Sequence, residues 1–578
     1  MKKLLVYLKS YKKETVLAPL FKMLEASFEL FVPLVIAAII DTGIENKDIT
    51  YIVKMALLLI VLAVIGLTCS LTAQYFSAKA AVGFAAKLKS ALFAHIESLS
   101  FKEIDTLGTS TLITRMTSDI NQVQSGVNLV LRLFLRSPFI VFGAMIMAFT
   151  IDVKAALIFV VAIPLLAIVV FGIMLISIPL FKKVQGALDN VLGITRQNLT
   201  GVRVIRAFNK EQSEIENFDD KNAVLTGLQN FVGKISALMN PVTFIIVNGA
   251  IAALIWVGAV RVDAGILTQG QVVALVNYMS QILVELVKLA NLIITVTKAV
   301  ACGNRIQSVF EIKPSMLEGD KHYECAEDEA SAVEFKNVNL CYNEGADNSL
   351  TGIDFSVKKG ETVGIIGGTG SGKSSLVGLI PRFYDATEGQ VLVDGVDVKE
   401  YGFDELREHV GIVMQKAVLF KGTIRENLKW GKNDATDEEL WNAIDAAQAR
   451  EFVETKDGGL DFEIAQGGKN LSGGQKQRLT IARALVRKPD ILILDDSASA
   501  LDYATDAKLR AAVAALPSNM TVFIVSQRTA SIMHADKIIV LDDGQVVGMG
   551  TQEELLENCE VYKEIYNSQF KTTSAKEA

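Results

Sequence analysis

The segment 367–374 has the composition of a phosphate-binding loop. It reads Gly367-Gly368-Thr369-Gly370-Ser371-Gly372-Lys373-Ser374 and satisfies the pattern G-x-x-x-x-G-K-[ST]. Glycines let backbone amides wrap phosphate groups, and the start of the following helix adds a favourable partial charge. The apolar stretch 362–366 precedes the loop and is expected to be the strand that the motif requires. The sequence therefore predicts that residues 367–374 bind the phosphates of a nucleotide. We include the next residue, Ser375, in this predicted site.

A second apolar run, 491–494, ends in the carboxylates Asp495 and Asp496. An aspartate at the end of a strand downstream of a phosphate loop is how P-loop ATPases present a carboxylate to magnesium. We therefore expect Lys373 to contact the terminal phosphates, and Ser374 and Asp495 to ligate the metal. ATP and Mg²⁺ are the cofactors that this pattern predicts.

Further residues around these motifs carry a resemblance to a known family. Tyr342 lies ahead of the phosphate loop, Gln415 lies between the two nucleotide motifs, and Asp502 ends the run Ser499-Ala500-Leu501-Asp502. The run Leu471-Ser472-Gly473-Gly474-Gln475 places a serine and two glycines at the start of an expected helix, which again exposes amides to a phosphate. Together these residues resemble the ATP-binding cassette (ABC) transporters, and the last run matches the signature of that family in full.

The resemblance implies a role for each residue. Tyr342 would stack on adenine, although a strand-end tyrosine in the core is the alternative. Gln415 would ligate Mg²⁺ and sense the transmembrane domain. The signature would close over ATP held by the phosphate loop of a second chain, and the loop with Asp502 would cross between the two sites.

Two positions depart from the family pattern. Asp496 stands where members usually carry a glutamate that acts on the attacking water, and Gln527 replaces the switch histidine near the γ-phosphate. The Asp carboxylate falls about 1.5 Å short of a Glu carboxylate, judged from ordinary bond lengths. A displacement of ~1 Å can cost ~100-fold in rate, and Gln cannot become a cation. The catalytic positions Asp496 and Gln527 therefore predict a degenerate, weak site.

Six long apolar segments occupy the first half of the chain, roughly at 17–41, 52–77, 129–150, 153–180, 239–261 and 271–298. Each reaches the ~20 residues that a helix needs to cross a bilayer. The mean hydropathy of +0.35 agrees with membrane spans. Several segments exceed the required length, so we expect helices that continue into water.

Basic residues set the predicted orientation. The N-terminal segment 1–13 and the long loops 78–128 and 181–238 are rich in Lys and Arg, which places them in the cytoplasm by the positive-inside rule. We expect a multi-pass protein of the cytoplasmic membrane, of bacterial type, with its N-terminus and ATPase domain in the cytoplasm. The long loops are expected to be helical. In ABC exporters such loops end in coupling helices that press on the ATPase domains; ordinary amphipathic surface helices are the alternative.

Composition also sets the domain boundaries. Residues 1–310 are predicted to form a six-helix α-helical transmembrane domain, 311–331 a linker, 332–570 a cytoplasmic α/β P-loop ATPase (the ABC cassette), and 571–578 a disordered tail. The net charge of −7 argues against nucleic acid as a partner. The six spans exclude the soluble ABC ATPases of DNA repair. Spans and cassette on one chain resemble exporters, since importers generally carry the cassette separately.

These features predict ATP-driven export of hydrophobic or amphipathic compounds, of the multidrug type. Two assemblies are open. A homodimer would carry two impaired sites and hydrolyse ATP slowly. A heterodimer with a second ABC half-transporter bearing Glu and His would keep one good site, completed by the signature of this chain. We favour the heterodimer, with hydrolysis mainly at that site.

Carboxylates inside the spans are the substrate candidates. Glu25 and Glu29 lie one helical turn apart on one face, and Glu285 lies in the sixth segment. Membrane-embedded carboxylates are costly enough to suggest function, and they could attract cationic amphiphiles. Alternatively, Glu25 and Glu29 lie on a cytoplasmic extension in water. A lipid flippase or peptide exporter, and an ATP-gated channel or regulator, are the other functions considered.

Overall fold

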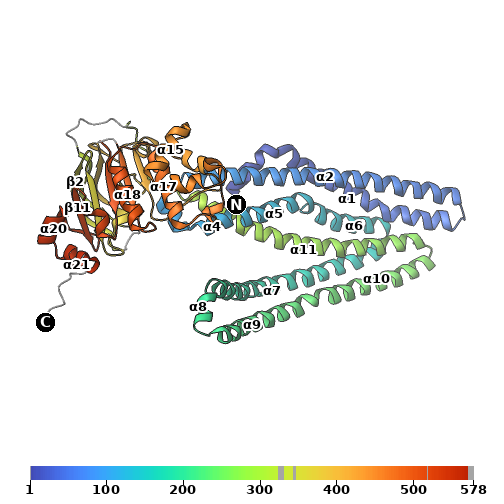
Figure 1. Ribbon diagram of the computed structural model, residues 1–578. Coiled ribbons are helices and arrows are strands. Elements are labelled where there is room, and N and C mark those ends of the chain that lie inside the picture. The colour runs from blue at the N-terminus through green and yellow to red at the C-terminus, as the bar shows by residue number, and fades with distance from the viewer. Residues whose placement is uncertain (1, 323–330, 343–346, 517–518, 571–578) are drawn as a thin grey trace. The chain divides into compact units, whose positions relative to one another are not determined.

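The computed structural model describes residues 2–322, 331–342, 347–516 and 519–570 (Figure 1). The expected tail 571–578 and residues 323–330 of the expected linker 311–331 lie outside the described residues. Contacts divide the chain into two units: Met1–Glu97 with Gly108–Ile312, and Ser98–Leu107 with Lys313–Ala578. A ten-residue piece of the first half, Ser98–Leu107, thus belongs by its contacts to the second unit. Its short helix α3 (Phe101–Leu107) packs there through Phe101, whose ring centroid is 4.7 Å from that of Phe383.

The first unit is helical. In chain order it contains η1 (Lys2–Tyr11), α1 (Lys12–Ala38), η2 (Ile39–Ile44), α2 (Ile49–Glu97), α4 (Thr109–Thr114), η3 (Arg115–Asp119), α5 (Ile120–Leu133), α6 (Arg136–Ile151), α7 (Val153–Thr200), α8 (Val202–Ala207), α9 (Glu211–Ala237), α10 (Met239–Asp263) and α11 (Gln269–Glu311). Six helical stretches in the described residues are long and apolar enough to span a membrane: Lys3–Ile44, Ile49–Glu97, Thr109–Ile151, Val153–Thr200, Glu211–Asp263 and Gln269–Glu311. The six predicted spans are confirmed, and the stretches exceed them at one or both ends.

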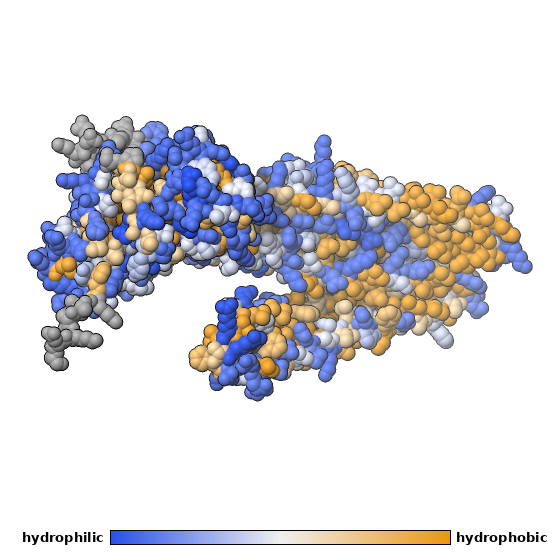
Figure 2. Space-filling model, viewed as in Figure 1, coloured by the Kyte–Doolittle hydropathy of each residue, from blue (hydrophilic) through white to orange (hydrophobic). Residues whose placement is uncertain are grey.

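The surface of this unit shows where lipid would lie. Figure 2 shows apolar residues covering the part of the helices that carries the predicted spans. In the most apolar window of α2, only 6% of residues are buried inside the protein. A helix that is apolar all round but exposed is expected to face lipid. Within the unit, α1, α6, α7, α10 and α11 bury a shared core that includes Phe159, Tyr278 and Ile282.

The second unit is α/β. A six-stranded sheet has the order β12-β11-β3-β10-β9-β6, with β3 (Thr362–Gly367), β6 (Val410–Val413), β9 (Ile491–Asp495), β10 (Thr521–Val525), β11 (Lys537–Asp542) and β12 (Gln545–Gly550). All neighbours in it are parallel except β11 and β12. A four-stranded antiparallel sheet has the order β2-β1-β4-β5, from β1 (Ser331–Leu340), β2 (Leu350–Lys358), β4 (Glu388–Val393) and β5 (Val396–Asp397). The expected combination of a six-span helical domain and an α/β ATPase domain is confirmed.

Helices and a two-stranded sheet complete the second unit, besides the short 3-10 turns η4 (Gly459–Asp461) and η5 (Gln466–Gly468). They are α12 (Lys373–Leu379), α13 (Phe403–His409), α14 (Ile424–Lys429), α15 (Asp437–Ala446), α16 (Arg450–Glu454), α17 (Gly473–Val486), α18 (Tyr503–Ala514), α19 (Thr529–Ile532), α20 (Gln552–Asn558), α21 (Glu560–Gln569) and the pair β7 (Gly422–Thr423) and β8 (Glu463–Ile464). β3 is buried along most of its length and β9 throughout, as expected for central parallel strands. Their carboxyl ends lie at one edge of the sheet, where the loops that they release can meet.

A close helix–helix approach in the first unit gives a stability prediction. A Cβ placed on Gly126 of α5 would lie 2.3 Å from the Cβ of Ala299 on α11, which is a clash with a rigid group. We expect Gly126→Ala to cost about 1–3 kcal/mol through overpacking. The measurement is the thermal unfolding midpoint in nanodiscs. The matched control is Gly172→Ala, since Gly172 also lies in a helix but its Cβ would meet nothing within 4 Å; equal midpoints for the two variants would contradict the prediction.

Candidate functional site

The phosphate loop connects β3 to α12 and needs glycine at two points that the structure identifies. A Cβ on Gly367 would lie 2.0 Å from the carbonyl oxygen of Leu541, so no larger residue fits beside β11. Gly372 has φ +91°, a backbone conformation that favours glycine. These constraints leave a tight turn of backbone ahead of the first turn of α12, the geometry that cradles phosphate.

Lys373 lies inside this loop. Its ammonium donates to the carbonyl oxygens of Gly367 at 3.0 Å and Gly368 at 2.6 Å. The residue is 9% exposed, and burial lowers the pKa of the ammonium, while Asp496 and Asp495 act in the opposite direction. A cation held on the rim of an amide cradle is placed to meet the charge of a triphosphate.

Ser374 and Asp495 are brought together across the sheet, as their predicted metal role requires. The Ser374 hydroxyl donates to Asp495 Oδ1 at 3.0 Å. Asp495 is 5% exposed, and burial raises the pKa of its carboxyl, with a smaller contribution from the charge of Asp496. A buried carboxylate beside a hydroxyl is a set of hard oxygen donors, which suits Mg²⁺. When bound, the ion would neutralise phosphate charge at this point.

Asp496 and Gln527 line one cavity of about 430 Å³ together with Lys373, Ser374 and Gln415. They lie at the ends of neighbouring strands, since β9 ends at Asp495 and β10 ends at Val525, and these two residues pair in the ladder. The Gln415 amide donates to Asp496 Oδ2 at 3.2 Å. The predicted metal ligands, the two altered positions and most of the phosphate loop are therefore neighbours.

Six further lining residues were not predicted as site residues from the sequence: Asp347, Asn348, Ser349, Val525, Asp543 and Gly544. The first three lie just before β2, Val525 ends β10, and the last two form the turn between β11 and β12. No pattern in the sequence marks them, because their place depends on how the two sheets pack.

Tyr342 lies next to this cavity but outside its lining. Its hydroxyl donates to Ser375 Oγ at 2.8 Å, and its ring meets the edge of Tyr384 with centroids 4.9 Å apart. It lines a second cavity of about 520 Å³, and Asn348 lines both cavities. Tyr342 also packs against the core of the sheet. The ring thus lies beside Ser375, just after the phosphate loop, and adenine stacking stays a prediction.

The signature lies on another part of the second unit. Ser472 caps α17 in a capping box, accepting from the Gln475 amide at 3.3 Å, while the Ser472 amide donates to Gln475 Oε1 at 3.0 Å. Ser472 and Gly473 are exposed, and none of residues 471–475 lines the phosphate-loop cavity. Asp502 caps α18 by accepting from Thr505, a contact that lowers the pKa of its carboxyl.

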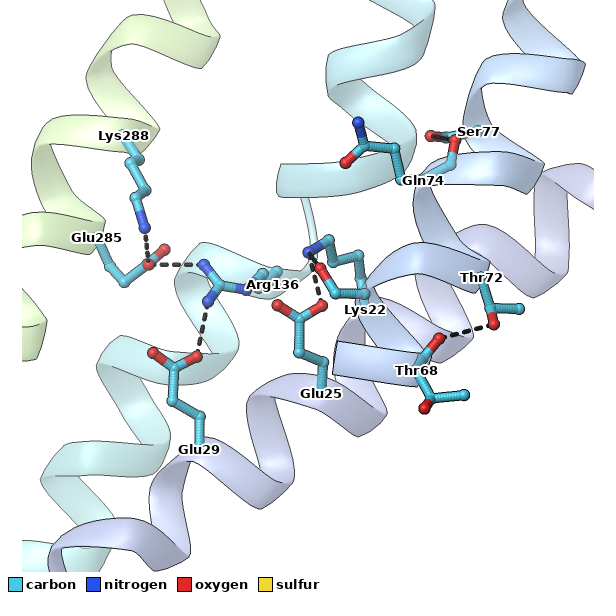
Figure 3. Close-up of polar contacts among 11 residues, drawn as sticks. Lys22, Glu25, Glu29, Thr68, Thr72, Gln74, Ser77, Arg136, Glu285 and Lys288 are labelled. Carbon is cyan, nitrogen blue, oxygen red and sulfur yellow. Dashed lines mark hydrogen bonds and ion pairs between the residues drawn. The ribbon is translucent and has the colours of Figure 1, made fainter. Parts of the chain in front are cut away.

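In the first unit, the three carboxylates proposed for substrate are all paired with cations (Figure 3). Arg136 of α6 donates to Glu285 of α11 at 2.7 Å and to Glu29 of α1 at 2.7 Å. Lys288 also donates to Glu285 at 2.8 Å. Lys22 donates to Glu25 at 2.6 Å. The sequence reasoning missed these cations, although Arg136 inside the apolar segment 129–150 was a visible signal.

A cavity of about 350 Å³ adjoins this ion cluster. Its lining includes the charged residues Glu29, Glu285 and Lys288 and apolar residues such as Val32 and Ile140; Glu25 is not part of the lining. The Glu29 side chain is 39% exposed, whereas that of Glu285 is 3% exposed. Of the three candidates, Glu29 is therefore the one best placed to meet a ligand.

Comparison with known proteins agrees with these features. Residues 15–286 match the family "ABC transporter transmembrane region", and residues 350–499 match the family "ABC transporter". The uncharacterised ABC transporter ATP-binding protein YfiB of Bacillus subtilis is 36% identical over 572 residues, covering 99% of both chains. The B. subtilis protein YgaD, named for multidrug export, is 33% identical and covers 98% of this chain and 99% of its own.

One further relative and one solved structure are also similar to this chain. The ATP-dependent lipid A-core flippase of Desulfotalea psychrophila is 34% identical over 80% of both chains. The solved structure of a bacterial Atm1-family ABC exporter with ATP bound superposes with a TM-score of 0.79 at 23% identity, covering 97% of this chain and 99% of that one. The chain is thus a multi-pass membrane protein that belongs to the ABC transporters, with an ATP-binding ATPase domain and the exporter fold of a half-transporter.

Proposed function

We propose that this chain is one half of a heterodimeric exporter that uses ATP to move hydrophobic or amphipathic compounds out across the cytoplasmic membrane. Its own phosphate loop would bind ATP with Mg²⁺ at a weak site. Its signature would complete a strong site on the partner chain. The observation that carries this proposal is that Asp496 and Gln527 line one nucleotide cavity, which the intact signature does not line.

The shared cavity matters because it confines both departures to one bound nucleotide. A shorter carboxylate and a group that cannot become a cation both weaken hydrolysis there. The ATP-binding parts are retained, since Lys373, Ser374 and Asp495 make the contacts expected of a phosphate and metal site. A homodimer would repeat the weak site twice. A partner with Glu and His would supply a competent one.

The helical loops of the first unit support coupling to an ATPase domain. The short helix α8 lies between the long helices α7 and α9. Val204 on α8 and Phe208 just after it are 61% and 72% exposed. An exposed apolar face on a polar loop is typical of a docking surface. We propose that α8 is a coupling helix on the cytoplasmic side.

The ion cluster refines the substrate proposal. All three carboxylates have a cation within hydrogen-bonding distance, so the cluster adds little free negative charge. Glu29 shares Arg136 with Glu285, its side chain is 39% exposed, and it lines a cavity that also has apolar lining residues. A small amphipathic compound with a donor or cationic group fits this arrangement. Names of relatives point to both multidrug export and lipid A flipping, so a lipid flippase stays the main alternative; a peptide exporter and, less favoured, an ATP-gated channel or regulator are the others.

The assembly is tested by purifying the tagged chain from its native membrane. We expect a stoichiometric second half-transporter with Glu and His at the positions of Asp496 and Gln527. We expect the chain purified alone to hydrolyse ATP far more slowly than the pair. Full family-level ATPase activity from the chain alone would contradict the proposal.

Two substitutions at the nucleotide sites separate the roles of the chain. In the purified pair, Asp496→Ala should change steady-state ATP turnover less than twofold, because little hydrolysis occurs at this site. Ser472→Arg should reduce turnover at least ~100-fold, because a bulky cation blocks the amides offered to the partner's nucleotide. A large loss from Asp496→Ala would show that this site hydrolyses ATP after all.

A substitution in the ion cluster tests the substrate site. We expect Glu29→Gln to raise the half-saturating concentration of a cationic dye about tenfold in vesicle transport, because a hydrogen bond to a charged group is lost. Glu45→Gln, in an exposed loop, is the control and should leave transport unchanged. Transport of labelled lipid, with no dye transport by either protein, would favour the flippase.

A further inference from the structure

The last helix of the second unit is bonded to the loop that carries Gln527. The Gln569 side chain, on α21, donates from Nε2 to the carbonyl oxygen of Gln527 at 2.7 Å. Its Oε1 accepts from the backbone amide of Thr529 at 2.8 Å. One carboxamide therefore bridges the loop 526–529 on both sides of Arg528, and it contacts backbone alone there.

Helix α21 is a firm base for this contact. Tyr562 of α21 is fully buried and packs in a core with Ile366 at the end of β3 and Ile532 of α19. The rings of Tyr566 and Phe570 lie 4.5 Å apart near the end of the helix. A helix anchored by a buried aromatic residue can hold a neighbouring loop in one position.

The loop is also held on its other side. The Arg528 guanidinium donates to the carbonyl oxygen of Leu501 at 3.2 Å and lies over the ring of Tyr503, 4.8 Å from its centroid. The Arg528 amide donates to Ser526 Oγ at 2.9 Å, and the Ser526 amide donates to Ile365 on β3 at 3.0 Å. Gln527 is thus fixed between β3, α21 and the segment that ends in Asp502.

Gln527 is the residue of the loop 526–529 that lines the phosphate cavity, and Val525, just before the loop, lines it too. The Gln527 side chain faces the cavity, whereas the Gln527 carbonyl oxygen accepts a hydrogen bond from Gln569. Displacing the carbonyl would rotate the backbone and move the side chain. The contact is made by an exposed side chain, so its loss leaves no buried cavity.

We infer that Gln569 is a positioning residue: it holds the Gln527 backbone so that the Gln527 side chain stays at the nucleotide. C-terminal helix α21 then belongs to the nucleotide site, although it lines no part of the cavity. The inference rests on the ATP site at this chain's phosphate loop and not on which partner the chain has.

The test measures how long this chain retains ATP. The purified transporter is loaded with radiolabelled photoreactive ATP, chased with cold ATP, and irradiated at intervals, and the label on this chain is counted after gel separation. We expect Gln569→Ala to speed release about fivefold, the effect of losing roughly one net hydrogen bond. Gln569→Glu keeps an oxygen that accepts from the Thr529 amide, but it places a carboxylate oxygen against the carbonyl oxygen of Gln527, which repels it. This variant should therefore release ATP at least as fast as Gln569→Ala.

Two controls separate positioning from a general structural effect. Ser568→Ala, next to Gln569 and bonded only within its own helix, should release ATP at the wild-type rate. In a Gln527→Ala background, Gln569→Ala should have no further effect, because the side chain that it positions is gone. An equal effect of Gln569→Ala with and without Gln527, or an unchanged release rate in Gln569→Ala, would overturn the inference. The heterodimer proposal is judged separately, by co-purification.

Discussion

The nucleotide site depends on the parallel pairing of β3, β10 and β9. Each strand ends at the same edge of the sheet, and the ladder pairs Val525 with both Ile365 and Asp495. The phosphate loop, the carboxylates at the end of β9 and the loop 526–529 after β10 therefore meet, although Asp495 follows Ser374 by 121 positions along the chain. The backbone hydrogen bonds of the ladder set the positions of these main-chain segments.

In the helical unit, ion pairs between helices are the main constraint. Lys22, Arg136 and Glu285 are buried inside it, so charge has to be matched by charge. Arg136 joins α1, α6 and α11 by reaching Glu29 and Glu285, and Lys22 matches Glu25. Removing one partner of such a network leaves a buried charge without compensation, which is strongly destabilising. The cluster therefore holds helices together as well as lining a cavity, and the two roles constrain the same side chains.

Sequence reasoning reaches furthest where the chemistry is local: the six spans are confirmed, and the roles of the phosphate loop and the signature stay predictions. Each of these features lies in one continuous segment. Backbone wrapping shapes the phosphate loop, helix capping shapes the signature and bilayer thickness sets the length of a span, and all three act over short stretches of chain. Sequence reasoning also placed Ser374 beside Asp495, because strand ends in an α/β sheet share an edge. It did not find the cations that pair with Glu25, Glu29 and Glu285, the packing of Ser98–Leu107 in the second unit, or the contact of Gln569 with the loop 526–529. Each of these depends on which helix lies beside which, and no local pattern records that.

The backbone at Asp496 explains why a shorter side chain there is not easily compensated. Its φ is +45°, a left-handed conformation that aspartate tolerates better than most residues. Its amide donates to Val525 at 3.0 Å, and its carbonyl oxygen accepts from the Ser499 hydroxyl at 2.8 Å, so the residue is tied to β10 on one side and to the turn before Asp502 on the other. The main chain cannot advance toward the nucleotide without breaking these bonds. The carboxylate is further engaged by Gln415 at 3.2 Å. Because the backbone is fixed, it cannot make up for the shorter side chain, and the Asp496 carboxylate does not reach as far as that of a glutamate. This rigidity is the physical reason for proposing that hydrolysis occurs mainly at a site on a second chain.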